Sequence, residues 1–219
     1  MSIIIMMENR TELLRKIKDE VVNSKDSPLY EYRIKNKYFP VIGEGSHTAK
    51  IMFIGEAPGR NEAETGRPFC GASGRVLDEL LASIGIDRKE IYVTNIVKDR
   101  PPENRDPLPN EIEFYASFLD RQIEIIKPKT IATLGRFSMA YIMNKFGLES
   151  ELKSISQIHG KIFNAPAPWG NEAKRSPAPS RDSGSGAWVK IIPLYHPAVA
   201  VYGTNKEILK KDFKILVTS

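Results

Sequence analysis

Three segments of this chain carry side chains that can bind a flat ligand or transfer protons. The segment GEAPGRNEAETGRPFCGASGR holds the carboxylates of Glu56 and Glu62 and the ring of Phe69, among glycines that let backbone N–H groups approach a ligand. Asn95 lies in TNIVKDRPPENRDPLP, and His196 lies in YHPAVAVYG. Carboxylates and histidine serve in acid–base chemistry, whereas an aromatic ring and a carboxamide can hold a planar molecule. The sequence therefore predicts a site for a small planar ligand.

The carboxamide of Asn95 can donate one hydrogen bond and accept another within one plane. Uracil presents O4 as an acceptor and N3–H as a donor, which matches this pair, whereas cytosine presents the opposite pattern. Phe69 stands among small residues, which leave room for a flat ligand on its ring. Two plainer roles remain open: Asn95 as the cap of a turn, and Phe69 as an aromatic of the core.

Four short apolar runs, each bounded by turn residues, predict buried strands because they are rich in isoleucine, valine or threonine. These runs are AKIMFIG (49–55), IYVTNIV (91–97), KTIATLG (129–135) and VKIIPLY (189–195). Segments with helical periodicity lie between and after them, at 74–85, 110–127, 136–147 and 205–217. The alternation predicts an α/β fold with three layers, α/β/α, around a central, mainly parallel four-stranded sheet.

In such sheets ligands bind beyond the carboxyl ends of the strands. GEAPG follows the first predicted strand, Asn95 lies near the end of the second, and His196 comes directly after the fourth, next to Pro197. A lone histidine is more often structural, which is the role that we expect for His47 and His159. His196 differs from them because it shares its strand edge with GEAPG and Asn95.

Composition indicates a single cytoplasmic domain over residues 1–219. Hydrophobic residues make up 41% and charged residues 27%, which is ordinary for a globular protein and excludes a wholly disordered chain. No apolar run approaches the roughly 20 residues that cross a bilayer, and the first residues lack the charge order of a secretory signal. The net charge of +5 has the sign that a polyanionic partner requires. We also expect an amphipathic N-terminal helix at about 7–24 and a flexible loop at about 165–187, which is rich in proline, glycine and serine.

Together the motifs resemble the uracil-DNA glycosylase superfamily, and most closely its family 4, the thermophile-type enzymes. The resemblance rests on GEAPG, GRPFCGASG, VTNIVKDRPPENRDP and HPA in this order, and it covers the chain from about Ser27 to the end. It implies a monofunctional hydrolase that cleaves the N-glycosidic bond of uracil, the deaminated form of cytosine, in DNA. The product is an abasic site for base excision repair, and the target base must leave the helix to be reached.

The resemblance also implies a role for each residue that contacts the base. Phe69 stacks on the flipped base, and Asn95 reads its Watson–Crick edge. Backbone groups around Glu56 and Ala57 contact its remaining oxygen. These three expectations together describe a uracil-binding pocket.

For catalysis, the resemblance implies that His196 hydrogen-bonds O2 of the departing uracil and stabilises its developing negative charge. Glu62 is our candidate to orient water or to offset the positive charge of the sugar. Glu56 is then expected to position the loop, although the two carboxylates can exchange these roles.

Contacts to the DNA backbone are expected from cations that follow the second strand, Lys98, Arg100 and Arg105, and from the final helix. The apolar tip that contains Val199 and Val201 either joins the core or wedges into a stack of bases. The expected partner is uracil-containing DNA, single- or double-stranded, bound by a monomer.

Family 4 enzymes carry an iron–sulfur cluster on four cysteines, and this chain departs from them there. A C-x-x-C pair before PLY is replaced by Ser24 and Ser27, the third position is Asp99, and the helix at 110–126 has no cysteine. Serine hydroxyls are poor iron ligands beside thiolates, so we expect no cluster, no metal and no other cofactor. The single cysteine, Cys70, matches none of the four positions and is expected to be a small buried residue.

One alternative is a catalytically inactive glycosylase-like module that binds DNA or another protein, because loss of the cluster ligands can accompany loss of activity. The presence of Asn95, His196 and Phe69 together argues against it. A nucleotide hydrolase is less consistent still, because GEAPGR lacks the lysine and the serine or threonine of a phosphate-binding loop. The chain also lacks the basic KRRIH-type insertion of the superfamily's uracil-crosslinking branch, so we do not expect covalent capture of DNA.

Overall fold

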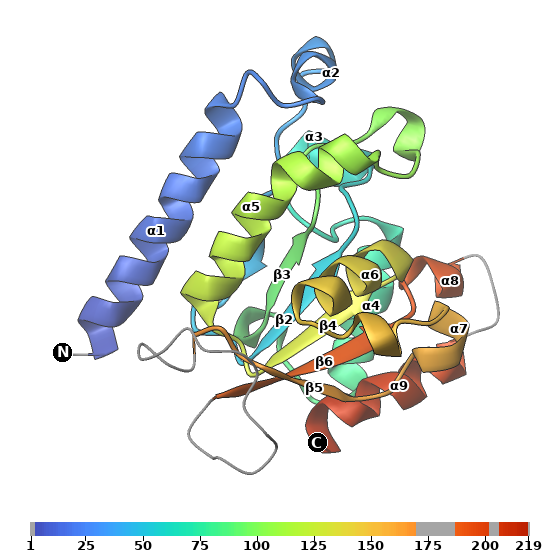
Figure 1. The fold of residues 1–219 in the computed structure, drawn as a ribbon. Helices are drawn as coiled ribbons and strands as arrows, with labels where there is room; N and C mark the ends of the chain where they lie inside the picture. The colour runs from blue at the N-terminus through green and yellow to red at the C-terminus, as the bar shows by residue number, and fades with distance from the viewer. Residues whose placement is uncertain (1–2, 170–186, 202–205, 219) are drawn as a thin grey trace.

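The computed structural model describes residues 3–169, 187–201 and 206–218, and its centre is a six-stranded sheet with the order β1-β3-β2-β4-β6-β5 (Figure 1). The four inner strands run parallel to one another. They are β3 (Tyr92–Asn95), β2 (Ile51–Gly55), β4 (Thr130–Leu134) and β6 (Trp188–Leu194). All four correspond to the predicted apolar runs, and the α/β fold with a mainly parallel sheet is confirmed.

Two short antiparallel strands extend the sheet beyond these four. β1 (Glu44–Gly45) pairs with β3 at one edge, and β5 (Phe163–Pro166) pairs with β6 at the other. The predicted strand count was therefore too low, because β1 has 2 residues and β5 has the sequence FNAP, without β-branched residues. A proline is tolerated at such an edge. The predicted loop at about 165–187 begins inside β5, and its residues 170–186 lie outside the described residues.

Helices cover both faces of the sheet, which confirms the three layers (Figure 1). One face packs against α1 (Ile3–Asn23), α5 (Pro109–Ile126) and α6 (Arg136–Lys145), and the other packs against α4 (Ala72–Ser83) and α9 (Lys206–Thr218). Side chains of β2 alternate between the two cores, as a strand requires. Met52 and Ile54 enter the first core, whereas Phe53 stacks on Phe213 of α9 with ring centroids 5.8 Å apart.

The remaining helices are short, and several border the carboxyl edge of the sheet. They are α2 (Tyr30–Lys35), α3 (Arg60–Thr65), α7 (Ile155–Ile158) and α8 (Ala198–Val201), with single 3-10 turns at Arg88–Glu90, Pro102–Asn104 and Glu149–Glu151. Among the described residues, no helix has both the length and the apolar character that a membrane span needs.

The carboxyl ends of β2 and β3 are held side by side beyond the regular sheet. Gly55 and Asn95 are partners in the register, and the N–H of Ile96 donates to the carbonyl of Gly55 at 3.1 Å. The N–H of Val97 then donates to the carbonyl of Glu56 at 3.0 Å. The segments GEAPG and TNIVK therefore leave the sheet together, with their side chains close to one another.

Candidate active site

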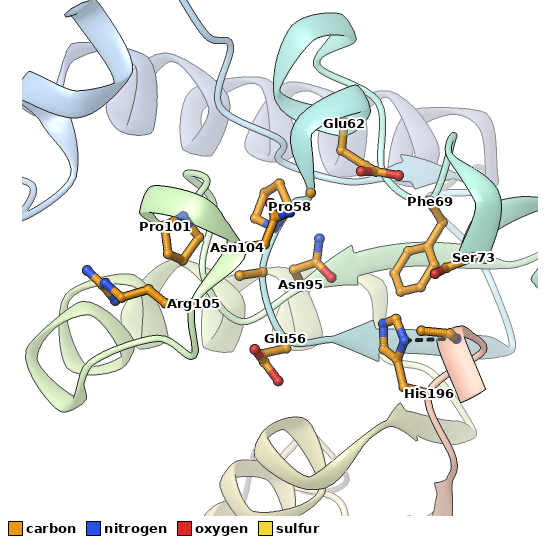
Figure 2. Close-up of a pocket in the computed structure, with 13 residues that line it drawn as sticks. Glu56, Pro58, Glu62, Phe69, Ser73, Asn95, Pro101, Asn104, Arg105 and His196 are labelled. Atoms are coloured by element: carbon orange, nitrogen blue, oxygen red, sulfur yellow. Dashed lines mark hydrogen bonds between the residues drawn. The ribbon is translucent and has the colours of Figure 1, made fainter. Parts of the chain in front are cut away.

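A pocket of about 470 Å³ lies at the carboxyl edge of the inner strands (Figure 2). This volume falls within the range of sites for small organic molecules. The residues that line it are Glu56, Ala57, Pro58, Gly59, Glu62, Phe69, Ser73, Asn95, Pro101, Asn104, Arg105, His196 and Ala198. The structure therefore brings together in one cavity all of the residues expected to bind the base or act in catalysis.

Asn95 presents an unused hydrogen-bond acceptor at this pocket. Its side chain is 2% exposed, and its Oδ1 atom is buried without a hydrogen-bond partner in the described structure. Buried polar atoms are nearly always paired, so an unpaired one at a cavity points to a ligand donor. The atom accepts no backbone N–H, which argues against the plainer role of a turn cap.

Gly55 leaves the space in which the Asn95 amide and the Phe69 ring lie. A Cβ atom at Gly55 would stand 2.3 Å from Asn95 Oδ1 and 2.8 Å from Phe69 Cζ. Both distances are far below van der Waals contact. Glycine at the end of β2 is thus a condition for both side chains to occupy this edge of the sheet.

The backbone of Phe69 adopts the left-handed conformation, with φ of 48°. For a bulky residue such a conformation costs of the order of 1–3 kcal/mol, so the surroundings must enforce it. Gly74 permits the close approach of this turn, because a Cβ atom there would lie 1.8 Å from the carbonyl oxygen of Phe69. Helix α4 therefore packs directly on this turn. The Phe69 ring is 6% exposed and lies 5.6 Å from the His196 ring, centroid to centroid.

Glu62 holds the same turn from the opposite side. Its Oε1 atom accepts hydrogen bonds from the N–H groups of Cys70 at 3.0 Å and Gly71 at 2.9 Å. Gly59 makes room for the carboxylate, because a Cβ atom there would lie 2.6 Å from Oε2. Glu62 is thus engaged with the backbone that carries Phe69 while it also borders the pocket (Figure 2).

His196 is arranged as a neutral hydrogen-bond donor. Burial lowers the pKa of its imidazole to about 4, against the opposing effect of the Glu62 charge. Its Nδ1 atom accepts a hydrogen bond from the N–H of Ala198 at 3.1 Å (Figure 2). In a neutral imidazole the proton then resides on Nε2. The ring consequently offers an Nε2–H donor on the side away from Ala198, toward the pocket.

Glu56 is the second carboxylate of the pocket, and its environment differs from that of Glu62. Burial raises the pKa of Glu56 to about 7, an effect that Asp106 increases and Arg136 reduces. Asp106 and Arg136 form an ion pair with each other beside the pocket. Glu56 therefore exchanges its proton near neutral pH, which is the range in which a general base is most effective.

Burial argues against two of the expected DNA-backbone contacts. Lys98 is fully buried, and its Nζ atom donates to Asn95 O and to side-chain oxygens of Thr94 and Gln122. Arg100 is 9% exposed and donates to the side-chain oxygens of its neighbours Asn104, at 2.8 Å, and Tyr38, at 2.9 Å. Neither cation is accessible to a phosphate.

Arg105 does reach the pocket wall, where it forms two hydrogen bonds with the carboxylate of Glu111, at 2.9 and 2.6 Å. Its contact with DNA stays a prediction. Val199 and Val201 are half-buried in α8, and Val199 packs against the core between the sheet, α4 and α9. The base-wedging role also stays a prediction, and Tyr202 of the same tip lies outside the described residues.

At the positions where the resemblance to family 4 enzymes implies cluster cysteines, this chain has a different structure. Arg33 and Asp99 form a buried ion pair at 3.0 Å, and the hydroxyl of Tyr115 donates to Asp99 at 2.6 Å. Ser27 Oγ lies 2.5 Å from the Tyr115 oxygen. We call these four residues the anchor network.

The anchor network does not fit an iron–sulfur cluster. It contains no thiolate, and its guanidinium can only donate hydrogen bonds. Across the described part of the chain, no group of three or more His, Cys, Asp or Glu could hold a metal ion. The remaining position, Ser24, donates from its Oγ to the carbonyl of Glu20 at 2.7 Å. Cys70 is half-buried rather than buried as expected, with Sγ 3.3 Å from Thr65 Oγ1.

Sequence reasoning missed several residues of the site, such as Ser73 and Asn104 in the pocket wall and Gln122 behind it. Gln122 is fully buried, and its Oε1 atom accepts a hydrogen bond from Lys98 at 2.6 Å. A signal was available, because Gln122 continues the apolar face of Tyr115, Leu119 and Ile126 at helical spacing. A polar residue on such a face needs a buried partner.

Comparison with known proteins agrees with this geometry. The uracil DNA glycosylase superfamily matches residues 42–217. The type-4 uracil-DNA glycosylase of Sulfurisphaera tokodaii is 42% identical over 203 residues, which are 92% of this chain and 82% of that protein. The type-4 enzyme of Archaeoglobus fulgidus is 40% identical over 209 residues, 95% of this chain and 92% of its own. The type-5 uracil-DNA glycosylase of Pyrobaculum aerophilum is 28% identical over 182 residues, 76% of this chain and 69% of its own.

Proposed function

Because the chain belongs to the uracil DNA glycosylase superfamily, we propose that it hydrolyses the N-glycosidic bond between uracil and deoxyribose in DNA. The observation that carries this proposal is the buried, unpaired Oδ1 atom of Asn95 in a pocket that it shares with a neutral His196. The first group recognises the base, and the second stabilises the leaving group. The product is an abasic site, as base excision repair requires.

Recognition begins with the flipped base in the pocket, where Phe69 stacks on its face. Such stacking contributes about 1–3 kcal/mol per base. Asn95 Oδ1 accepts the N3–H of uracil, and the amide nitrogen donates to O4. Cytosine presents an acceptor at N3, so it would face Oδ1 with a second lone pair and leave both groups unpaired.

Cleavage transfers negative charge to uracil O2 and positive charge to the sugar. His196 donates from Nε2 to O2, and this hydrogen bond strengthens as the charge develops. A donor in such a role typically contributes ~10²–10³ in rate. Because the imidazole is neutral, Nδ1 can keep accepting from the N–H of Ala198 while Nε2–H donates to O2.

The environments of the two carboxylates support an assignment opposite to the one that the sequence suggested. Glu62 accepts two backbone N–H groups, so we assign it to hold the Phe69 turn. Glu56 has a pKa of about 7 and its carboxylate accepts no backbone N–H from the described residues, so we assign it to orient and deprotonate the attacking water. One carboxylate thus shapes the pocket, and the other serves the reaction.

We further propose a monofunctional enzyme without an iron–sulfur cluster. Among the described residues that line the pocket none is a lysine, the amine that would attack the sugar in a bifunctional glycosylase. The anchor network supports the second point, because no thiolate lies at the cluster positions. We propose that the enzyme acts as a monomer, in the cytoplasm, on single- or double-stranded DNA.

The test uses oligonucleotides that contain one uracil, one cytosine or one thymine at the same position. Incubation followed by alkali should break only the uracil strand, in both single-stranded and U:G duplex form. Binding of uracil DNA without cleavage would overturn the enzymatic proposal and favour the inactive module. A preparation of the His196→Ala variant controls for a contaminating glycosylase.

A further inference from the structure

Within the described part of the chain, Lys98 is a buried lysine without an acidic partner. It is fully buried, and no carboxylate among the described residues forms an ion pair with it. Lysine is almost never fully buried unless it is paired, because loss of hydration is costly. Burial accordingly lowers the pKa of this amine well below its ordinary value. The contacts of its nitrogen must offset this cost.

The Lys98 nitrogen has three acceptors, one for each hydrogen of an ammonium group. It lies 2.6 Å from the backbone oxygen of Asn95, 2.6 Å from Gln122 Oε1 and 2.9 Å from Thr94 Oγ1. We call Thr94, Lys98 and Gln122 the pocket network. It ends directly behind the residue whose side chain faces the ligand.

The hydrogen bond from Lys98 to the Asn95 carbonyl takes the place of a bond from a neighbouring strand. Strand β1 pairs with Tyr92 and Val93 and does not extend to Asn95. The carbonyl of Asn95 therefore receives its hydrogen bond from the side chain of Lys98 instead of from the next strand. Through this bond the amine fixes the peptide that follows Asn95.

The other two contacts make the amine itself immobile. Gln122 donates from Nε2 to the carbonyl of Ile42 at 2.9 Å and to the hydroxyl of Tyr92 at 3.2 Å. Its Oε1 atom is thereby turned toward Lys98. Thr94 donates its hydroxyl hydrogen to the same Ile42 carbonyl at 2.6 Å, which leaves its lone pairs for the amine. The network is closed, and it joins β3 to α5 and to the segment before β1.

We propose that Lys98 is a positioning residue that sets the direction of the Asn95 carboxamide and thereby the recognition of uracil. The bond to the Asn95 carbonyl fixes the backbone on one side of its Cα, while the contact with Gly55 restricts the amide on the other. A misplacement of about 1 Å in such a group can cost ~10²-fold in rate. This inference rests on the proposed glycosylase activity.

The experiment compares Lys98→Met, which keeps the volume and removes the donors, with Tyr115→Phe in the anchor network as a control for lost stability. Lys98→Met should lower the single-turnover rate on uracil DNA at least ~10-fold and weaken free-uracil affinity by a similar factor, because Asn95 is no longer fixed. Affinity for abasic-site DNA, which has no base to read, should change less than ~2-fold. Tyr115→Phe should leave all three within ~2-fold at a temperature where both variants are folded.

Equal losses in rate, uracil affinity and abasic-site affinity would overturn the proposal, as would a Lys98→Met enzyme that matches the wild type. If Lys98→Met does not fold, Gln122→Met is the second variant, because it removes one acceptor of the amine. It should weaken uracil affinity a few-fold and leave abasic-site affinity constant. An unchanged uracil affinity would overturn the proposal. A wild-type protein that cleaves no uracil DNA overturns the proposed function itself. A wild type that cleaves, beside an unaffected variant, overturns only the role of Lys98.

Discussion

Lys98 and Asp99 are consecutive, both are buried, and their side chains enter two different networks. In the anchor network Asp99 meets the opposite charge of Arg33 at 3.0 Å and the hydroxyl of Tyr115 at 2.6 Å. In the pocket network Lys98 meets only neutral oxygens. The first network pairs its charges and joins distant segments of the chain, whereas the second leaves a cation unpaired immediately behind Asn95. The contrast separates charges that hold the fold together from a charge that orients the site.

The anchor network connects four parts of the molecule that the sheet alone does not. Besides Asp99, Arg33 donates to the carbonyls of Val21 at 3.1 Å and Val22 at 2.9 Å, near the end of α1. Tyr115 contributes from α5, and Asp99 from the segment that leads to the pocket rim. Burial raises the pKa of Asp99, while Tyr115 and Arg33 act in the opposite direction. This cross-link lies where the resemblance to family 4 enzymes would place their cluster.

The largest effect should come from breaking the charge pair. Arg33→Met leaves Asp99 buried without its counter-charge, and removal of one partner from a buried pair typically costs ~3–5 kcal/mol in unfolding free energy. Urea unfolding followed by circular dichroism measures this loss. Arg15→Met is the matched control, because the Arg15–Glu12 pair has a similar distance, 2.8 Å, but exposed side chains. An exposed pair contributes at most about 1 kcal/mol.

The comparison fails if Arg33→Met and Arg15→Met lose the same stability. Activity measurements test the contrast between the two networks further. Under conditions where Arg33→Met remains folded, it should cleave uracil DNA at a rate within ~3-fold of the wild type. A larger loss of cleavage rate would mean that the anchor network contributes to catalysis as well as to stability.

The next effect concerns catalysis and leaves stability almost unchanged. His196→Ala should lose at least ~10²-fold in single-turnover cleavage, because the donor to the departing uracil is removed. Affinity for abasic-site DNA should change much less. If the cleavage rate of the variant stays within a few-fold of the wild type, backbone donors stabilise the departing uracil instead of His196. A circular dichroism spectrum must show that the variant is folded.

A smaller effect is expected with pH, and its direction distinguishes two titrating groups. The pKa of Glu56 is raised to about 7, so deprotonation makes the base available and the rate should rise through about pH 7 and then level off. The pKa of His196 is lowered to about 4, so this residue stays neutral over the whole rise. Glu56→Gln should lower the rate and remove the rise. A rise that persists in this variant would exclude Glu56 as the titrating group.

Iron should have no effect at all. Because the anchor network has no thiolate, the purified protein should contain less than about 0.1 iron atom per chain and should lack a cluster absorption band. A chelator should change neither the melting temperature nor the cleavage rate. Iron near four atoms per chain would contradict the assignment of these positions.

The sequence predicted the inner strands and the edge at which the site lies, because continuous apolar runs and the residues that follow them are local signals. It could not predict where the charges of KDR at 98–100 point. Such a run is typical of an exposed loop, but Lys98, Asp99 and Arg100 are all buried. Part of what holds them, Gln122, Arg33 and Tyr38 among the partners, lies far away in the sequence and is set by tertiary packing. The edge strand β5 was missed for a related reason, since its pairing with β6 and not its composition makes it a strand.

The contact at Gly55 limits how this pocket can evolve or be redesigned. With 2.3 Å between a Cβ at this position and Asn95 Oδ1, every substitution displaces the recognising amide before it alters the cavity. Neighbours that line the pocket without this constraint, such as Ser73 and Ala57, are better positions at which to vary base preference. A library for new damaged bases would vary those two positions and keep residue 55 as glycine.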